Sequence, residues 1–488
     1  MTLRQFSRLL VDADQWSARA RRLGAGEGTL TALWGETDAV HLAILDDTSG
    51  AIDVCTLSCR GGYFPSVARH HPAAIRLERS ITDLFGLTPE GAPDARPWLD
   101  HGKWGVRYPL AKTPLTDLSA AAYSFLPSEG EGLHQIPVGP VHAGIIEPGH
   151  FRFTANGETV VRLEERLGYV HKGTESLMMG ADLARGAQLA GRVSGDSTVA
   201  YALAFARAAE NACATDAPPR ANCLRALLAE LERIANHFGD IGAICNDASF
   251  PLIQAHCAVL REQVLRSVDG CFGHRFARDC IVPGGMTADL DRGGIALLRD
   301  FTRDARRKFA RIVEVYDNTA SLQDRTGGTG IVKTDLARRF GAGGYVGRAS
   351  GRGFDARRAM PYPPYDSIPF EVPVLDAGDV NARVWIRIRE IEQSLLLIER
   401  ILDGLPAGPV RSDIDAGSGE ALSLVEGFRG YILVYLRLDE RGRIARCHLR
   451  DPSWFQWPLL ECAIEGNIVA DFPLCNKSFN CSYSGHDL

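Results

Sequence analysis

The chain has 488 residues, of which 45% are hydrophobic and 23% are charged, and its 54 basic and 60 acidic side chains give a net charge of −6. That length allows two or three domains with a sizeable buried core. A mildly acidic chain offers no electrostatic reason to bind nucleic acid, which requires clustered Lys and Arg. No apolar run approaches the roughly 20 residues that span a bilayer, and residues 1–16 lack the apolar core of a signal peptide. We therefore expect the chain to stay in the cytoplasm, where it can still dock on a membrane partner.

The 12 cysteines are spread along the chain, and no two of them form a C-x-x-C pair. In a chain without an export signal we expect free thiols rather than disulfides. Zinc and iron–sulfur sites on a single chain usually use such close pairs. The spacing therefore argues against a metal cluster held by this chain alone.

Residues 1–125 have the pattern of a small mixed domain. Segments 38–45 and 50–57 are predicted strands, separated by the turn-prone sequence Asp-Asp-Thr-Ser-Gly. Segment 78–87 predicts a short helix that a glycine terminates. The pattern alone is that of a generic α+β domain.

Several short motifs in this domain occur in the order of a known family. They are Glu78-Arg79, Asp83-Leu-Phe-Gly-Leu87, Asp94-Ala-Arg-Pro97, Trp104 and Tyr108-Pro-Leu110. Together they resemble the small peripheral-arm subunit of respiratory complex I, the 30-kDa or C-type subunit. The resemblance implies a domain that has no redox centre and helps to assemble the arm.

Long helical patterns dominate the middle of the chain. Apolar residues follow helical spacing over 222–239, where Gly239 is predicted to end the helix. They do so again over 379–405, where Asp379 is the predicted N-cap. These helices should pack in a bundle.

The remaining segments predict a linker, strands and one long loop. They are a linker at 111–132, strands with tight turns at 134–162, an ordered Gly- and Arg-rich loop with short strands at 325–364, and strands at 426–451. The predicted fold class is therefore α+β. A small N-terminal α+β domain at 1–125 is followed, at 126–488, by a domain with a central helical bundle and flanking strands.

Residues 134–455 carry a second ordered series of motifs. They are Gly139-Pro-x-His142, Gly168-Tyr-Val-His-Lys-Gly-x-Glu175, Glu230-Leu-x-Arg-Ile-x-Asn-His237, Arg325-Thr-Gly327, Arg348-Ala-Ser-Gly351, Pro361-Tyr-x-x-Tyr-Asp366, Gly378-Asp-Val-x-x-Arg383, Glu426-Gly-Phe-Arg-Gly430 and Arg450-Asp-Pro-Ser453. The series resembles the 49-kDa or D-type subunit of complex I and the large subunit of group 4 [NiFe]-hydrogenases. Fusion to a C-type domain resembles the formate-hydrogenlyase type.

The chain departs from the hydrogenase pattern at the metal ligands. Working hydrogenases of that kind carry four cysteines, in R-x-C-G-x-C and D-P-C-x-x-C, and the matching positions here are Ser194, Ser197, Ser453 and Gln456. Hydroxyl and amide groups are hard, weakly basic substitutes for the thiolates that hold nickel, so we expect the metal site to be lost. The segment 457–488, which active hydrogenases cleave after metal insertion, is expected to be retained and ordered through Trp457, Phe472 and Phe479.

The resemblance implies proton and quinone chemistry at three residues. His142 and His150 are candidates to hydrogen-bond or protonate a quinone head group, because the pKa of a histidine lies near working pH. The alternative is that both are loop histidines bonded to backbone. Glu175 matches a proton-relaying glutamate of hydrogenases and would act if burial raised its pKa. A structural ion pair with Arg185 or Arg192 would also explain it.

The charged neighbours of the lost ligands suggest a polar floor. Arg192, Asp196 and Asp451 are expected to form a charge-paired cluster, either to shape a cavity or only to fill space. Ser194, Ser197 and Ser453 could hydrogen-bond a ligand or local backbone. The tyrosine that contacts quinone in complex I would fall near Gly195, and this chain has none there.

The leading interpretation is a metal-free redox subunit of a membrane-associated complex. It binds no cofactor of its own, a quinone is a possible ligand, and a [4Fe–4S] cluster lies in a small partner subunit. Membrane ion-translocating subunits are the other expected partners, and the chain itself is expected to lie peripherally at the cytoplasmic side of the inner membrane. A non-catalytic scaffold is one alternative, and a polar cavity filled by its own side chains near Glu175 would favour it. An active [NiFe]-hydrogenase is the other, and bound nickel would favour that.

Overall fold

The computed structural model describes residues 8–116 and 123–488, and its first layer is a four-stranded sheet of order β1-β4-β3-β2. The strands β1 and β4 are parallel, and β3 is antiparallel to both β4 and β2. One face of the sheet is covered by two helices. The elements are β1 (Arg8–Val11), α1 (Ala13–Gly24), β2 (Thr29–Glu36), β3 (Ala39–Leu45), β4 (Ile52–Ser58), β5 (Tyr63–Pro65), the 3-10 helix η1 (Pro72–Ala74), α2 (Ile75–Phe85) and β6 (Thr88–Glu90).

The predicted pieces of this domain are present. Strands β3 and β4 match the two predicted strands, and Asp46 closes the turn between them by accepting hydrogen bonds from the backbone N–H groups of Thr48 and Ser49. The helix α2 ends at Gly86, whose φ of 73° is a left-handed conformation that glycine adopts without strain. The boundary at 125/126 remains a prediction, and residues 117–122 of the predicted linker lie outside the described residues.

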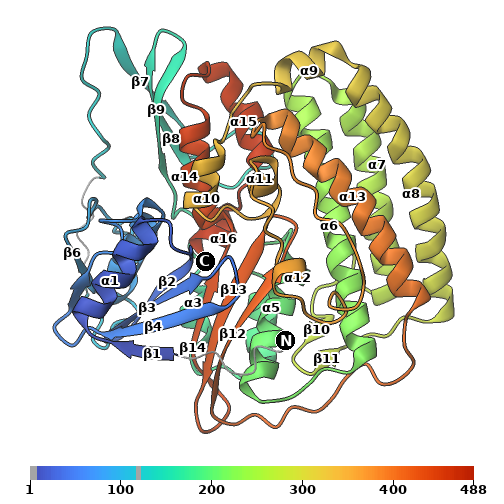
Figure 1. The fold of residues 1–488 in the computed structure, drawn as a ribbon, viewed down its shortest axis with the longest axis horizontal. Helices are drawn as coiled ribbons and strands as arrows, with labels where there is room; N and C mark the ends of the chain where they lie inside the picture. Colours follow the sequence, from blue (N-terminus) through green and yellow to red (C-terminus); the bar gives the residue numbers. More distant parts are fainter. Residues whose placement is uncertain (1–7, 117–122) are drawn as a thin grey trace.

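A helical bundle lies on the side of the molecule opposite the N-terminal sheet, at the right in Figure 1. It consists of α6 (Pro219–Asp247), α7 (Pro251–Phe272), α8 (Arg292–Asn318) and α13 (Val380–Asp403). Asp379 caps α13 as predicted, since its side chain accepts a hydrogen bond from the N–H of Ala382. The prediction that Gly239 ends a helix was wrong. The helix α6 continues through Gly239, where an added Cβ would come within 3.1 Å of Cδ of Arg261, so the glycine serves close helix packing.

Two three-stranded antiparallel sheets accompany the bundle. The sheet β12 (Gly419–Glu426), β13 (Tyr431–Leu438), β14 (Ile444–Arg450) packs its β12 and β13 side chains against the second face of the N-terminal sheet. The helix α5 (Thr198–Ala212) lies against the same two strands. The other sheet is β7 (Leu133–Val138), β8 (His150–Asn156), β9 (Thr159–Arg166). The sequence pattern predicted β13 and β14 but missed β12.

The Gly- and Arg-rich segment 325–364 differs from the prediction of a loop with short strands. Its described residues form the short helices α10 (Thr334–Arg339), α11 (Gly344–Ala349) and α12 (Ala356–Ala359), after the end of α9 (Ala320–Thr326). The reason is a long-range ion network. Arg348 of α11 bonds Glu390 of α13 at 2.7 Å and Glu426 of β12 at 2.9 Å. Local sequence periodicity does not reveal such partners.

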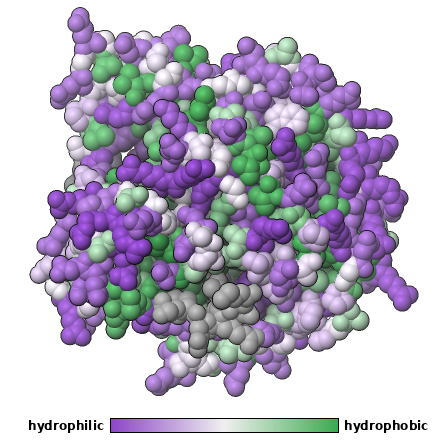
Figure 2. All heavy atoms as spheres, in the orientation of Figure 1, coloured by the Kyte–Doolittle hydropathy of each residue, from purple (hydrophilic) through white to green (hydrophobic). Residues whose placement is uncertain are grey.

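The smaller elements connect these layers. They are α3 (Thr174–Met178), α4 (Leu183–Ala190), β10 (Ile281–Val282), β11 (Gly285–Met286), α14 (Ser453–Ala463), the 3-10 helix η2 (Val469–Asp471), α15 (Phe472–Phe479) and α16 (Tyr483–Asp487). Over the described ranges 8–116 and 123–488, none of the helices combines the length and the apolar character needed to cross a membrane. The face shown in Figure 2 is largely hydrophilic, with apolar residues scattered among polar ones.

Candidate functional site

The structure brings together, through the C-terminal segment, the four positions that match the hydrogenase cysteines. Ser194 and Ser197 immediately precede α5, and Ser453 and Gln456 lie in the first turn of α14. Ser482 joins the two stretches: its Oγ is 2.9 Å from Oγ of Ser194, and its backbone N–H donates to Oγ of Ser453 at 2.8 Å. We call these five residues the serine cluster. The side chains at all four matching positions are buried in it.

Charged residues close the serine cluster on one side. The guanidinium of Arg429 donates two hydrogen bonds to Asp196, at 2.6 and 3.3 Å, and a third to Oγ of Ser197 at 3.2 Å. Burial would raise the pKa of Asp196, but the charge of Arg429 outweighs it and lowers that pKa. Asp451 accepts hydrogen bonds from the Tyr201 hydroxyl at 2.5 Å and from the N–H of Ser453 at 2.8 Å.

Arg192 is not part of this cluster. Its guanidinium pairs with Asp279 at 2.6 Å, and the two side chains are 42% and 43% exposed. The prediction that it shares a charge-paired floor with Asp196 and Asp451 was therefore wrong. The residue that pairs with Asp196 is Arg429, which the sequence placed in a motif without assigning it a role.

The C-terminal segment fills the space between the two stretches with its own atoms. Arg429 donates from Nε to the carbonyl of Asn480 at 2.5 Å, and Trp454 stacks on His486 with ring centroids 4.0 Å apart. At Gly485 an added Cβ would lie 2.4 Å from Oδ2 of Asp451, so no larger side chain fits there. The expectation that the segment is ordered through Trp457, Phe472 and Phe479 is confirmed, because all three are buried.

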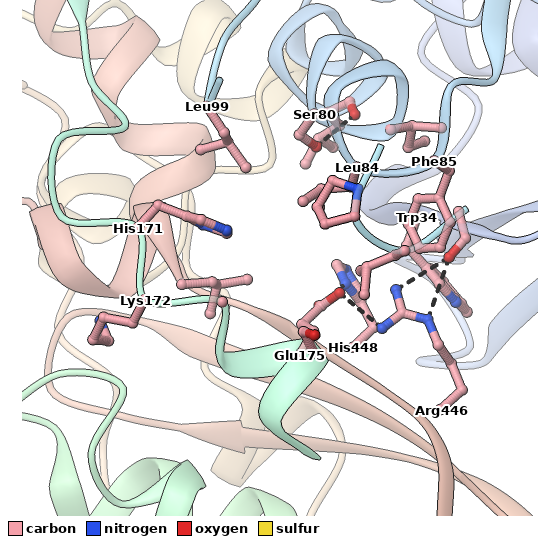
Figure 3. Close-up of a pocket in the computed structure, with 18 of the residues that line it drawn as sticks. Trp34, Ser80, Leu84, Phe85, Leu99, His171, Lys172, Glu175, Arg446 and His448 are labelled. Atoms are coloured by element: carbon pink, nitrogen blue, oxygen red, sulfur yellow. Dashed lines mark hydrogen bonds and ion pairs between the residues drawn. The ribbon is translucent and has the colours of Figure 1, made fainter. Parts of the chain in front are cut away.

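Glu175 lies outside the serine cluster, on α3. Its carboxylate accepts a hydrogen bond from Nη1 of Arg446 at 2.7 Å and one from Nδ1 of His448 at 2.7 Å, both on β14 (Figure 3). Burial favours the neutral acid, but these two partners outweigh it and lower the pKa of Glu175 to about 2. The condition set for a proton relay, a pKa raised by burial, is therefore not met. The alternative pairs with Arg185 or Arg192 are also wrong.

A cavity of about 320 Å³ lies beside Glu175, between the two halves of the chain. The N-terminal part contributes Trp34 of β2 and Leu84 and Phe85 of α2 (Figure 3). The second half contributes His171 and Glu175 together with Arg446 and His448. The exposed residues Lys172 and Ser176 also line it, so it reaches the surface.

The functional residues that sequence reasoning missed are Arg446, His448 and Trp34. Arg446 and His448 stand two apart on a predicted strand, so they share one face. Charged residues alternating along a buried strand were a signal that could have identified them. The aromatic partner Trp34 stacks on His448 with centroids 5.4 Å apart, and no sequence pattern links those two positions.

His142 and His150 do not line the cavity and do not join the serine cluster. His142 lies in the β7–β8 loop and His150 begins β8; Nε2 of His142 is 2.7 Å from the carbonyl oxygen of Gly149, and Nδ1 of His150 is 3.2 Å from that of Gly139. Burial lowers the pKa of His150. Their geometry is that of loop histidines bonded to backbone.

Comparison with known proteins agrees with this architecture. The sequence profile of the respiratory-chain NADH dehydrogenase 49 Kd subunit matches residues 253–418 and 410–487, and that of the 30 Kd subunit matches residues 37–117. Formate hydrogenlyase subunit 5 of Escherichia coli (strain K12) is 32% identical over 441 residues, which cover 87% of this chain and 77% of that protein. An NADH-quinone oxidoreductase subunit of Syntrophobacter fumaroxidans is 30% identical over 354 residues, covering 71% and 94%.

A solved structure shows the same fold. A chain of the membrane-bound sulfane sulfur reductase (MBS), an archaeal respiratory membrane complex, superposes with a TM-score of 0.70 at 25% identity and covers 73% of this chain and 99% of that one. The matches define a large subunit of the kind found in membrane-bound NADH-quinone oxidoreductase and hydrogenase-related complexes. Within that class, the chain belongs to the family of complex I 49-kDa subunits and group 4 hydrogenase large subunits, with a 30-kDa-type domain fused at its N-terminus.

Proposed function

We propose that the chain is a metal-free large subunit of a membrane-associated redox complex. The observation that carries the proposal is the serine cluster, where hydroxyls stand at three former ligand positions and an amide at the fourth. Nickel bound in such sites needs soft thiolate donors. Ser194 and Ser453 instead form hydrogen bonds with Ser482, and the amide of Gln456 donates to the backbone carbonyl of Arg429. These residues do not fit a nickel–iron centre.

Its family supports a proposed position for the subunit. It lies against a small subunit that holds a [4Fe–4S] cluster, at the cytoplasmic side of a membrane complex with ion-translocating subunits. Electrons that arrive at that cluster pass to an acceptor of the quinone class, and the complex couples this transfer to proton movement. The names of relatives, such as the NADH-quinone oxidoreductase of Syntrophobacter fumaroxidans, support the acceptor class.

A scaffold without an acceptor is the second candidate, and one observation favours it. The serine cluster is packed with the chain's own side chains and with the segment around Ser482, and an added Cβ at Gly485 would lie 2.4 Å from Oδ2 of Asp451. The cavity beside Glu175 argues against a scaffold, because a volume of about 320 Å³ is open there. Space beside a charged cluster supports ligand binding over a purely structural role.

The decisive experiment uses the purified complex. Nickel content by mass spectrometry and quinone-dependent reoxidation of the partner cluster are measured for wild type, Glu175→Gln and His142→Ala. We expect no nickel and a reoxidation that Glu175→Gln slows, because the neutral amide disturbs Arg446 and His448 at the cavity wall. Stoichiometric nickel would overturn the proposal in favour of a hydrogenase. The absence of both nickel and acceptor-dependent reoxidation would establish the scaffold.

A further inference from the structure

The cavity beside Glu175 has the size and walls of a site for a small aromatic molecule. Its volume of about 320 Å³ is at the lower end of the roughly 300–1,000 Å³ typical of ligand pockets. Four aromatic side chains line it, from both halves of the chain: Trp34, Phe85, Trp104 and Trp454. Aromatic walls favour a flat ring, which they can contact by stacking or edge-to-face packing.

The charged groups in the cavity wall already have partners. Glu175 accepts from Arg446 and His448, and Nη2 of Arg446 also donates to the carbonyl of Gly35 at 3.1 Å. The amino group of Lys172, at the mouth, donates to the carbonyls of Val193 and Ser484. A charged ligand would have to break these pairs, so the wall favours an uncharged one.

His171 has a ring nitrogen without a hydrogen-bond partner, and among the described residues of the wall the same holds for the buried Nε1 of Trp34 and Nε2 of His448. Its Nδ1 lies 2.6 Å from the carbonyl oxygen of Asp487, and a carbonyl can only accept, so Nδ1 carries the proton. In the neutral ring Nε2 is then an acceptor, and no residue of 8–116 or 123–488 hydrogen-bonds it. Burial lowers the pKa of His171, which favours that neutral ring. Figure 3 shows the ring pointing into the cavity, and it stacks on Trp104 with centroids 4.6 Å apart.

We propose that this cavity binds a small uncharged aromatic molecule with a ring hydroxyl, the class of phenols and reduced quinones, whose hydroxyl donates to Nε2 of His171. The ring lies among the aromatic side chains of the two halves, so the fused N-terminal domain supplies one wall of the site. The inference rests on the proposed function in one respect, that a quinol is what the proposed acceptor becomes after reduction. The cavity is separate from the serine cluster and from the β7–β8 loop.

Two probe molecules test the hydrogen bond directly. Binding of 4-methoxyphenol and of 1,4-dimethoxybenzene to the full-length chain is measured by isothermal titration calorimetry. The two share a ring and differ by one hydroxyl, so we expect the phenol to bind at least about fivefold tighter, the worth of one net hydrogen bond. Equal affinities, or no binding of either probe, would overturn the proposal.

Variants then assign the effect to His171. We expect His171→Leu to weaken phenol binding about tenfold and to remove the difference between the probes. His256→Leu is the matched control, because His256 lies exposed on α7. If His171→Leu fails to fold, Leu84→Trp carries the test, since it fills the cavity from α2 and should abolish binding of both probes. A Leu84→Trp chain that folds and still binds the phenol would contradict the site.

The two proposals fail in different ways. The probes are titrated into the chain alone, so the result depends on neither nickel nor the partner cluster. Nickel in the purified complex would overturn the proposed function and leave the phenol preference intact. A nickel-free complex whose large subunit shows no phenol preference would overturn only the inference about His171.

Discussion

The serine cluster and the cavity beside Glu175 lie on either side of the same C-terminal segment, yet one is closed and the other is open. Ser482 and Gly485 fill the cluster, whereas Leu488 lines the cavity and Asp487 bonds its His171. The cluster is rich in hydroxyls and carboxylates, each of which must find a partner when it is buried. The chain therefore packs closely around these groups to supply their hydrogen-bond partners. The cavity walls are mainly apolar and aromatic, and they leave space where two rigid surfaces meet.

The comparison predicts that removing a charged side chain destabilises the closed serine cluster more than any other change tested. In Asp196→Ala the guanidinium of Arg429, only 3% exposed, keeps its charge without a carboxylate. Removing one partner of a buried pair usually costs about 3–5 kcal/mol, and because Asp196 itself is 32% exposed we expect a loss nearer to about 2–4 kcal/mol. Chemical denaturation of the full-length chain measures it.

The control for this substitution is an exposed pair. Asp279→Ala removes the partner of Arg192, where both side chains are about two-fifths exposed, and should cost less than about 1 kcal/mol. Similar losses for the two variants would mean that the serine cluster is no tighter than the surface.

The cavity side is tested by the pH dependence of stability. Although burial favours the neutral acid, Arg446 and His448 lower the pKa of Glu175 from an ordinary 4.5 to about 2. A lowered folded pKa contributes stability above the unfolded value and loses it as pH falls through the folded value. Wild type should therefore exceed Glu175→Gln by about 2–3 kcal/mol near neutral pH. That advantage should shrink between about pH 5 and pH 2.

Thermal or chemical unfolding of both chains across this pH range gives the measurement, and the difference between them removes the contribution of the other carboxylates. A difference that stays constant from pH 7 to pH 3 would show that Arg446 and His448 do not hold the carboxylate in its charged form.

The sequence predicted those parts of the fold that local periodicity specifies. The spacing over 379–405 gave the helix α13 with its N-cap Asp379, and alternation gave β13 and β14. Gly239 misled because glycine can end a helix or allow two helices to approach, and only the neighbour, Arg261, decides which. Segment 325–364 misled because the partners of Arg348 lie elsewhere in the chain.

In the candidate site, too, the sequence located some positions, but only the structure shows their partners. Family motifs located Ser194, Ser197, Ser453 and Gln456, and the structure brings these positions together around Ser482. The partners of Glu175 could not be read from its surroundings, because Arg446 is 271 residues away and is fixed by strand pairing. The sequence could not show that Nε2 of His171 is a free acceptor, because that depends on the bond between Nδ1 and the carbonyl oxygen of Asp487.

The smallest expected effect separates the serine cluster's hydroxyls from the packing of the C-terminal segment. Ser482→Ala removes the contact with Oγ of Ser194 and the hydrogen bond that Oγ accepts from the N–H of Gly485 at 2.8 Å. We expect a loss of about 1 kcal/mol in denaturation and faster protease cleavage after Asn480. Ser176→Ala, at the exposed rim of the cavity, should stay within about 0.5 kcal/mol of wild type. If the two variants behave alike, backbone and aromatic contacts hold the segment, and the hydroxyls follow its closure rather than cause it.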